Sequence, residues 1–144
     1  MAQPIAISGI HHLRLTVTDV TRSRAFYTNL LGFDVAAQMP PPSDPSYDAV
    51  NAILFGGVVL MKGTLLLGLR PVAARGDRFD EDRVGLDHLS FSVRSRDALE
   101  EAVRLLDEHG IAHGQITALP SFGIYVLEFR DPDNIQLELT APHE

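Results

Sequence analysis

A strand pattern that occurs twice is the strongest constraint on this chain. Residues 11–19, HHLRLTVTD, alternate apolar Leu13, Leu15 and Val17 with polar side chains. Residues 88–93, HLSFSV, repeat the alternation with a histidine at the same place. Apolar residues at every second position indicate a β-strand with one face on a core. A second copy of that strand indicates an internal repeat, so motifs in one half can be compared with those at the equivalent positions of the other.

A helix pattern follows each of these strands. In the first half, Asp19 is suited to the N-cap of a helix, and Gly32 is suited to the left-handed position that ends it. In the second half, Ser95 and Gly110 occupy the corresponding positions. Between these ends, apolar residues recur at helical spacing, at Val20, Phe26, Tyr27, Leu30 and Leu31 in the first half and at Leu99, Ala102, Val103 and Leu106 in the second.

Further strand-like runs follow each helix, at residues 33–39, 54–61 and 64–70 in the first half and at residues 111–117, 124–130 and 135–140 in the second. The pattern is weakest over residues 47–54. We therefore predict an α+β fold for a single domain of residues 1–144, built of two tandem βαβββ modules, residues 8–70 and 86–141, joined by a linker at 71–85. Because one module is too small to bury its own sheet well, we expect a shared, curved mixed sheet with helices on the convex face and a concave cup.

The same alternation decides which side chains leave the core. The polar face of the predicted strands carries His12, Arg14, Thr16, His88, Ser90, Ser92, Glu128, Gln136, Glu138 and Thr140. A solvated sheet face would be rich in Lys and Glu, so this set is better suited to a lined cavity. The imidazoles of His12 and His88 and the carboxylate of Glu138 form a ligand set of divalent metal sites with open positions. A hydrogen-bonded structural histidine is the plainer interpretation of each residue alone, and His11 is the alternative ligand to His12.

A carboxylate interrupts the apolar run at residues 124–130. Glu128 is a candidate catalytic general base, because burial in a cup would raise its pKa. In the structural alternative it pairs with Arg14 or Arg130. Arg14 in turn either binds a substrate anion or neutralises Glu128. The candidate substrate-binding residues on this face are Arg14, Thr16, Ser90, Ser92 and Gln136.

Composition narrows the function classes. The 144 residues are 45% hydrophobic and 22% charged, which is typical of a globular protein. The absence of cysteine excludes disulfides, thiolate nucleophiles and Cys-ligated metals. The net charge of −7, without a basic cluster, predicts no nucleic-acid partner. No apolar run approaches the ~20 residues that span a bilayer, and no secretory signal is evident, so we expect a cytoplasmic protein without membrane contact.

These motifs together resemble the vicinal oxygen chelate superfamily, which includes glyoxalase I, fosfomycin- and bleomycin-resistance proteins and extradiol dioxygenases. The resemblance covers nearly the whole chain, through residues 12–19, 23–27, 31–33, 85–91 and 129–139. It implies paired βαβββ modules around a metal in an open cup, with His12, His88 and Glu138 at ligand positions. Many members have a fourth ligand where this chain has Gly68, so the resemblance implies three protein ligands, unlike glyoxalase I. Asn134 stands where the family's turn usually has Gly, and Asn tolerates the left-handed conformation.

The resemblance also implies chemistry and assembly. Family members bind neighbouring oxygens of a small molecule to one divalent ion, here Zn, Fe(II), Mn or Ni. The reaction would be that of a lyase or isomerase, an epoxide-opening transferase or a ring-cleaving dioxygenase. The alternative is a non-catalytic dimeric protein that sequesters a drug, as bleomycin-resistance members do. A homodimer is implied in either case, and the modules pair within one chain or across two.

Overall fold

The chain divides into two compact units, and each has its own hydrogen-bonded sheet. The computed structural model describes residues 1–143, and the first unit is Met1–Arg75 while the second begins at Gly76. This boundary lies inside the segment 71–85 that the sequence predicts as the linker. The α+β fold class is confirmed: each unit contains a four-stranded mixed sheet and few helices.

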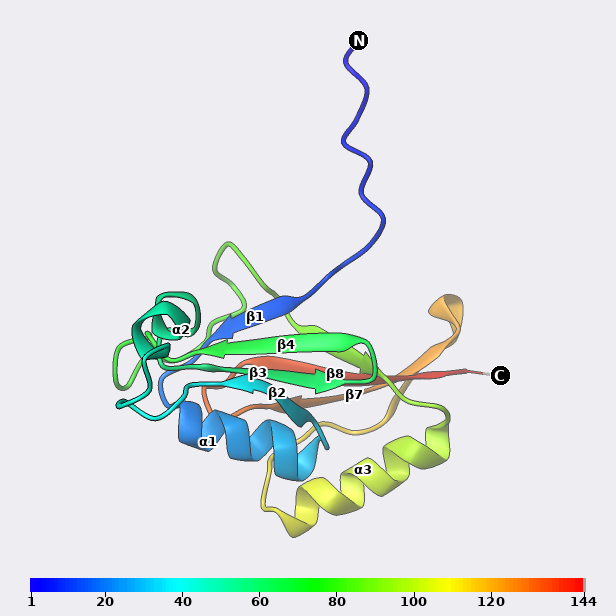
Figure 1. Ribbon diagram of the computed structural model, residues 1–144. Coiled ribbons are helices and arrows are strands. Elements are labelled where there is room, and N and C mark those ends of the chain that lie inside the picture. Colours follow the sequence, from blue (N-terminus) through cyan, green and yellow to red (C-terminus); the bar gives the residue numbers. More distant parts are fainter. Residues whose placement is uncertain (144) are drawn as a thin grey trace. The chain divides into compact units, whose positions relative to one another are not determined.

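The first unit follows the predicted βαβββ order with one added helix. Its elements are β1 (Leu13–Thr16), α1 (Val20–Ala25), a π-helical turn (Phe26–Leu30), β2 (Asp34–Gln38), α2 (Tyr47–Leu54), β3 (Val58–Lys62) and β4 (Leu65–Arg70). The strand order is β1-β4-β3-β2, with β1 parallel to β4 and the other pairs antiparallel (Figure 1). Residues 1–10 are exposed throughout.

The second unit repeats this topology. Its elements are β5 (Leu89–Ser92), α3 (Arg96–Glu108), β6 (Thr117–Leu119), a 3₁₀ turn (Pro120–Phe122), β7 (Ile124–Arg130) and β8 (Gln136–Pro142). The strand order is β5-β8-β7-β6, again with one parallel pair, β5 and β8. The internal repeat inferred from the sequence is therefore present as a repeated strand order.

The repeat extends to the register of the strands. In the first unit, Leu13 lies opposite Leu67. In the second, Leu89 lies opposite Leu137. Counting one residue from each pair makes His12 equivalent to His88, and Gly68 equivalent to Glu138. The alignment implied by the resemblance is thus the alignment of the hydrogen bonds.

Local sequence explains where the helices begin. The Asp19 side chain accepts hydrogen bonds from the backbone N–H groups of Thr21 and Arg22, at 2.9 and 3.1 Å, and so caps α1. Ser95 Oγ accepts from the Ala98 N–H at 3.3 Å and caps α3 in the same way. Both caps were predicted. No helix among residues 1–143 combines the length and the apolar character that a bilayer crossing requires.

Each unit has a core of its own on the helix side of its sheet. Leu15, Val17, Tyr27, Leu67 and Leu69 are at most 5% exposed in the first unit. Their counterparts in the second unit are Leu99, Leu106, Leu127, Phe129 and Leu137, which are at most 2% exposed. Burying one such side chain contributes about 1.5–3 kcal/mol, so these residues fix which face of each sheet is apolar. The opposite face of each sheet is therefore the one that can carry polar side chains.

Two segments differ from the predicted elements. Residues 47–54 form α2, an element outside the βαβββ plan. Residues 111–116 lie beside β7 with one isolated bridge, between His113 and Phe129, and form no continuous strand. The side chain of His113 contacts the carbonyl of Gly114 and the carboxylate of Asp107. The regular edge strand β6 begins only at Thr117.

The predicted linker is attached to the second unit. Asn134, left-handed at φ 67°, accepts from Arg78 Nη2 at 2.8 Å and donates to the Phe79 carbonyl at 3.1 Å. Glu81 accepts two hydrogen bonds from the Arg130 guanidinium, at 2.7 and 3.0 Å. The β7–β8 turn therefore anchors residues 78–81.

The Glu81–Arg130 pair gives a pH-dependent contribution to stability. The hydrogen bond from Arg130 lowers the pKa of Glu81 from 4.5 to about 2. A carboxyl with a lowered pKa stabilises the fold above the unfolded-state pKa, and the contribution is lost as pH falls toward the folded-state value. We expect Glu81→Gln to be less stable than wild type at pH 7, with a difference that shrinks between about pH 5 and about pH 3.

Urea unfolding followed by circular dichroism at each pH measures this difference. Glu100→Gln is the matched control, because the exposed Glu100–Arg96 pair on α3 contributes little. A wild-type-to-variant difference that stays constant with pH would contradict the prediction.

Candidate functional site

The polar face of the second unit carries most of the predicted site residues. His88 directly precedes β5, and its Nδ1 lies 2.5 Å from Asp87 Oδ1. Glu138 on β8 lies opposite Ser90 on one side and Glu128 on the other. Gln136, Glu138 and Thr140 alternate with buried residues along β8, as predicted.

Hydroxyl groups orient the Glu138 carboxylate. Thr140 Oγ1 donates a hydrogen bond to Glu138 Oε1 at 3.0 Å. Ser90 Oγ lies 2.5 Å from Thr140 Oγ1, so the two hydroxyls and the carboxylate form a chain across β5 and β8. The chain occupies one oxygen of Glu138 and fixes its rotamer. Thr140 was placed on this face by its sequence pattern, but its contact with Glu138 was not predicted.

The electrostatics of this face favour positive charge. The hydrogen bond with Asp87 raises the pKa of His88, and the negative charges of Glu138, Asp87 and Glu128 raise it further, against partial burial. Asp87 holds the Nδ1 side of the ring, so Nε2 is the ring nitrogen that a metal could bind. A carboxylate behind a histidine is the usual outer partner of a metal-bound imidazole. His88 and Glu138 thus have the chemistry of metal ligands.

The structural alternative for Glu128 was an ion pair with Arg14 or Arg130. Within the second unit, Arg130 makes its ion pair with Glu81, at 2.7 Å. Glu128 still acts on Arg130 through its charge, which contributes to the raised pKa of Arg130 after the larger effect of Glu81. The side chain of Glu128 is exposed on the same face as Glu138. Its predicted role as a general base therefore stays a proposal.

In the first unit, His12 borders a small cavity. The ring stands edge-on to His11, with Nδ1 atoms 2.9 Å apart. The cavity has a volume of about 230 Å³, and its walls are mainly apolar. It is lined by His12, Arg14, Ile53, Leu54, Val59, Leu66 and Gly68. Helix α2, absent from the predicted plan, supplies part of this wall. Thr16 lies exposed on the same strand as Arg14.

Arg14 occupies the space that a side chain at position 68 would take. A Cβ on Gly68 would lie 2.9 Å from Arg14 Cγ. Arg14 Nη2 donates to the Ile53 carbonyl at 2.7 Å, which anchors the guanidinium against α2. The position equivalent to Glu138 thus holds an arginine side chain from the neighbouring strand in place of a carboxylate. The number of protein ligands to a metal stays a prediction.

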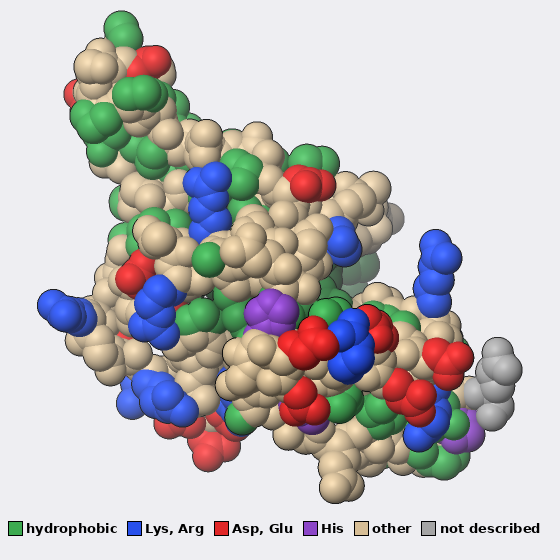
Figure 2. All heavy atoms as spheres, turned by 90° about the horizontal axis from the view of Figure 1, so that it is seen from below, with side chains coloured by type: hydrophobic (Ala, Val, Ile, Leu, Met, Phe, Trp, Pro, Cys, Tyr) green, Lys and Arg blue, Asp and Glu red, His purple; other side chains and the backbone are tan. Residues whose placement is uncertain are grey.

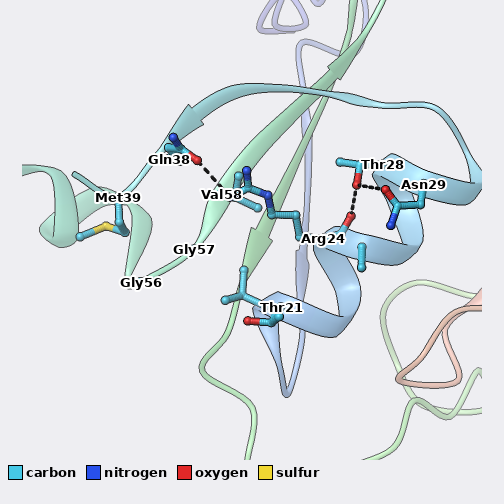
Figure 3. A pocket seen from close by; sticks show the side chains of 11 residues that line it. Thr21, Arg24, Thr28, Asn29, Gln38, Met39, Gly56, Gly57 and Val58 are labelled. Atoms are coloured by element: carbon cyan, nitrogen blue, oxygen red, sulfur yellow. Dashed lines mark hydrogen bonds between the residues drawn. The ribbon is translucent and has the colours of Figure 1, made fainter. Parts of the chain in front are cut away.

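A second cavity of the first unit lies away from these residues. It has a volume of about 490 Å³ and lies between α1 and the segments around Gln38 and Gly57 (Figure 3). Arg24 reaches across it and donates to Gln38 Oε1 at 3.0 Å. Thr28 Oγ1 donates to the Arg24 carbonyl at 2.9 Å. No predicted site residue lines this cavity.

The predicted metal ligands are divided between the units. His88 and Glu138 belong to the second unit and His12 to the first. Neither unit alone, over residues 1–143, gathers three His, Asp or Glu side chains that could share an ion. Ser92 and Gln136 lie on the polar face of the second unit with His88. On the face that Figure 2 shows, several Lys and Arg side chains lie beside acidic ones.

Comparisons with known proteins agree on one family. The sequence model of the Glyoxalase/Bleomycin resistance protein/Dioxygenase superfamily matches residues 9–139. The uncharacterized protein YwkD of Bacillus subtilis is 33% identical over 133 residues, covering 92% of this chain and 96% of that protein.

Solved structures show the same fold. A glyoxylase/bleomycin resistance protein/dioxygenase domain from Frankia sp. EAN1pec has a TM-score of 0.72 and 30% identity, covering 96% of this chain and 95% of that one. A mutant of the fosfomycin resistance protein FosX from Listeria monocytogenes, complexed with Mn(II) and 1S,2S-dihydroxypropylphosphonic acid, has a TM-score of 0.67 and 17% identity. That match covers 93% of this chain and 90% of FosX.

The packing of Arg14 over Gly68 predicts a coupled effect on stability. Gly68→Ala places a methyl group against Arg14 Cγ and should cost about 1–3 kcal/mol of unfolding free energy. In an Arg14→Ala background the Cγ and Cδ atoms are gone and the nearest remaining atom of residue 14 is its Cβ, at an ordinary contact distance of 3.5 Å, so the same change should cost less. Denaturant unfolding of the two single variants and the double variant measures the coupling. Strictly additive effects would show that the two positions do not share this space.

Proposed function

We propose, because this chain belongs to the Glyoxalase/Bleomycin resistance protein/Dioxygenase superfamily, that it is a metal-dependent enzyme acting on vicinal oxygens of a small molecule. The observation that carries the proposal is the shared register of the two units. It makes His12 and His88 equivalent and leaves Glu138 as the only carboxylate at the paired position. If the two units bring these equivalent positions together, they supply two imidazoles and one carboxylate.

The donor set fits a divalent ion. His12, His88 and Glu138 would hold it, and nitrogen and oxygen ligands suit Zn, Fe(II), Mn or Ni. A bound ion would act as a Lewis acid on a coordinated substrate oxygen. The fosfomycin-resistance neighbour that contains Mn(II) also contains a ligand with adjacent hydroxyl groups, and this supports the pairing of metal and vicinal oxygens by analogy of fold.

The remaining polar residues would orient the substrate and move protons. Glu128 lies opposite Glu138 on the neighbouring strand, a position suited to a general base that takes a proton from the substrate. Ser90 and Thr140 fix the Glu138 carboxylate through their hydroxyl chain. The other proposed substrate contacts are Arg14, Thr16, Ser92 and Gln136. A metal site, a general base and polar substrate contacts are compatible with lyase or isomerase, transferase and dioxygenase chemistry.

The ligand set predicts metal binding that depends on single residues. We expect purified protein to bind about one divalent ion per chain, and His12→Ala and Glu138→Gln to lose it. His109→Ala is the matched control, since that ring contacts the Leu105 carbonyl at 2.8 Å on α3. Elemental analysis after dialysis, with Mn, Fe(II), Zn and Ni titrated separately, measures the ion. Metal-free wild-type protein whose ligand binding survives His12→Ala would support the sequestration alternative.

Two histidine variants test the proposed homodimer. We expect light scattering to give the mass of a dimer. Mixing refolded His12→Ala and His88→Ala chains then separates the two pairings. Heterodimers regain an intact ligand set only if His12 of one chain joins His88 and Glu138 of the other. A monomeric mass would contradict the dimer, and metal recovered on mixing would assign the site to both chains.

A further inference from the structure

We infer that Arg14, Arg70 and Phe55 form an anion-binding subsite beside the first unit's cavity, for a small apolar molecule that carries an oxyanion. The inference rests on the proposed function for the identity of this molecule as the substrate. The anion-binding property itself depends only on the first unit. Neither Arg70 nor Phe55 has a role in the metal site.

Two guanidinium groups meet on one aromatic ring. The Arg70 Cζ lies 4.1 Å from the centroid of the Phe55 ring, and the Arg14 Cζ lies 5.8 Å from it. Each contact is attractive by itself, but the two positive charges repel each other. Among residues 1–143, neither arginine has a carboxylate within ion-pair distance. An anion that accepts hydrogen bonds from both guanidinium groups would offset this repulsion.

Arg70 also holds an unused donor. Its Nε is buried and has no hydrogen-bond partner. A buried N–H without an acceptor is destabilising, so native structures rarely contain one without a reason. Because the guanidinium presents its donors as a planar fork, an oxyanion is the acceptor that matches it best once a shift of the side chain exposes the Nε.

Two residues of the subsite are held in place at some conformational cost. Phe55 ends α2 in the left-handed region at φ 54°, an uncommon conformation for an aromatic residue. Its backbone N–H donates to the Asn51 carbonyl at 2.8 Å, which holds the main chain of Phe55 at the end of α2. Arg14 donates a hydrogen bond to the Ile53 carbonyl, and its aliphatic part lies in the space left by the absence of a side chain at Gly68. Strain of this kind persists where the surrounding structure determines it, and it is concentrated at binding sites.

The adjacent cavity selects the rest of the ligand. Ile53, Leu54, Val59 and Leu66 give it apolar walls, and Arg14 belongs to both the cavity and the subsite. Its volume of about 230 Å³ lies below the range of roughly 300–1,000 Å³ that holds drug-sized ligands. The polar face of the second unit presents Glu128 and Glu138 instead, which disfavour an anion there. A small ring or branched chain with a carboxylate or phosphonate group fits these properties.

Paired probes of equal shape test the inference. The full-length protein, labelled with ¹⁵N, is titrated with benzoate and with benzamide before and after treatment with EDTA. We expect benzoate to shift the amide signals of Phe55, Gly68 and Arg70 in a saturable manner. The affinity for benzamide should be lower by a factor of about ten or more. Phenylphosphonate in a third titration distinguishes a phosphonate from a carboxylate site.

Variants connect the shifts to the two arginines. Arg70→Met should weaken benzoate binding about tenfold or more, and Arg70→Lys should lose less because it keeps the charge without the fork. Arg24→Met, in the other cavity, is the matched control. Equal binding of benzoate and benzamide, an unchanged affinity in Arg70→Met, or shifts centred on Arg24 would each overturn the inference. If Arg70→Met does not fold, the selectivity and shift map of the wild type decide the question.

Failure here is distinguishable from failure of the proposed function. Benzoate binding persists after EDTA if the subsite exists, whether or not a metal binds at His12. Metal binding lost in His12→Ala, together with indifference to benzoate, would preserve the metal site and remove only the anion subsite.

Discussion

The parallel pairing of the first and last strand in each unit determines the arrangement of the site residues. A parallel pair cannot be joined by a tight turn, so the chain leaves β1 through α1 and leaves β5 through α3 before it returns. The return strand, β4 or β8, then lies beside the first strand in a fixed register. That register carries the residue before β5, His88, onto the face that also holds Glu138. The core enforces the same choice of face, because a shift by one residue would bury the polar set.

The repeat also shows where the two halves have diverged. The second unit keeps Glu138 and orients it through Thr140 and Ser90, two short hydroxyl side chains. The first unit has Gly68 at the paired position, and the space is filled by Arg14. An extra carboxylate there would meet the aliphatic part of the arginine. Glycine at position 68 therefore offers no side chain that could bind an ion and makes room for the Arg14 cation beside the cavity.

The sequence predicted those elements whose signals are local or periodic. Period-two burial identified β5, β7 and β8 because one face of each meets a core, and side-chain caps identified the starts of α1 and α3. Helix α2 was missed because it buries only Leu54 and its preceding Ser46 makes no side-chain capping bond. Arg70 was missed although the alternation that places Gly68 on the polar face also places Arg70 there. The pairing of residues 78–81 with the β7–β8 turn depends on Asn134, whose tertiary contacts have no periodic signature.

Net charge is a poor guide to the ligand of such a site. The chain carries a formal −7, which by itself favours a cationic partner. Charges more than about 8 Å apart are largely screened at physiological salt, so the ligand responds to its immediate neighbours. Around the first unit's cavity these neighbours are Arg14, Arg70 and the imidazole of His12, and no carboxylate lines the cavity. An ion held by His12 would add positive charge at the same wall, so an anionic, oxygen-rich molecule is favoured there in spite of the acidic chain.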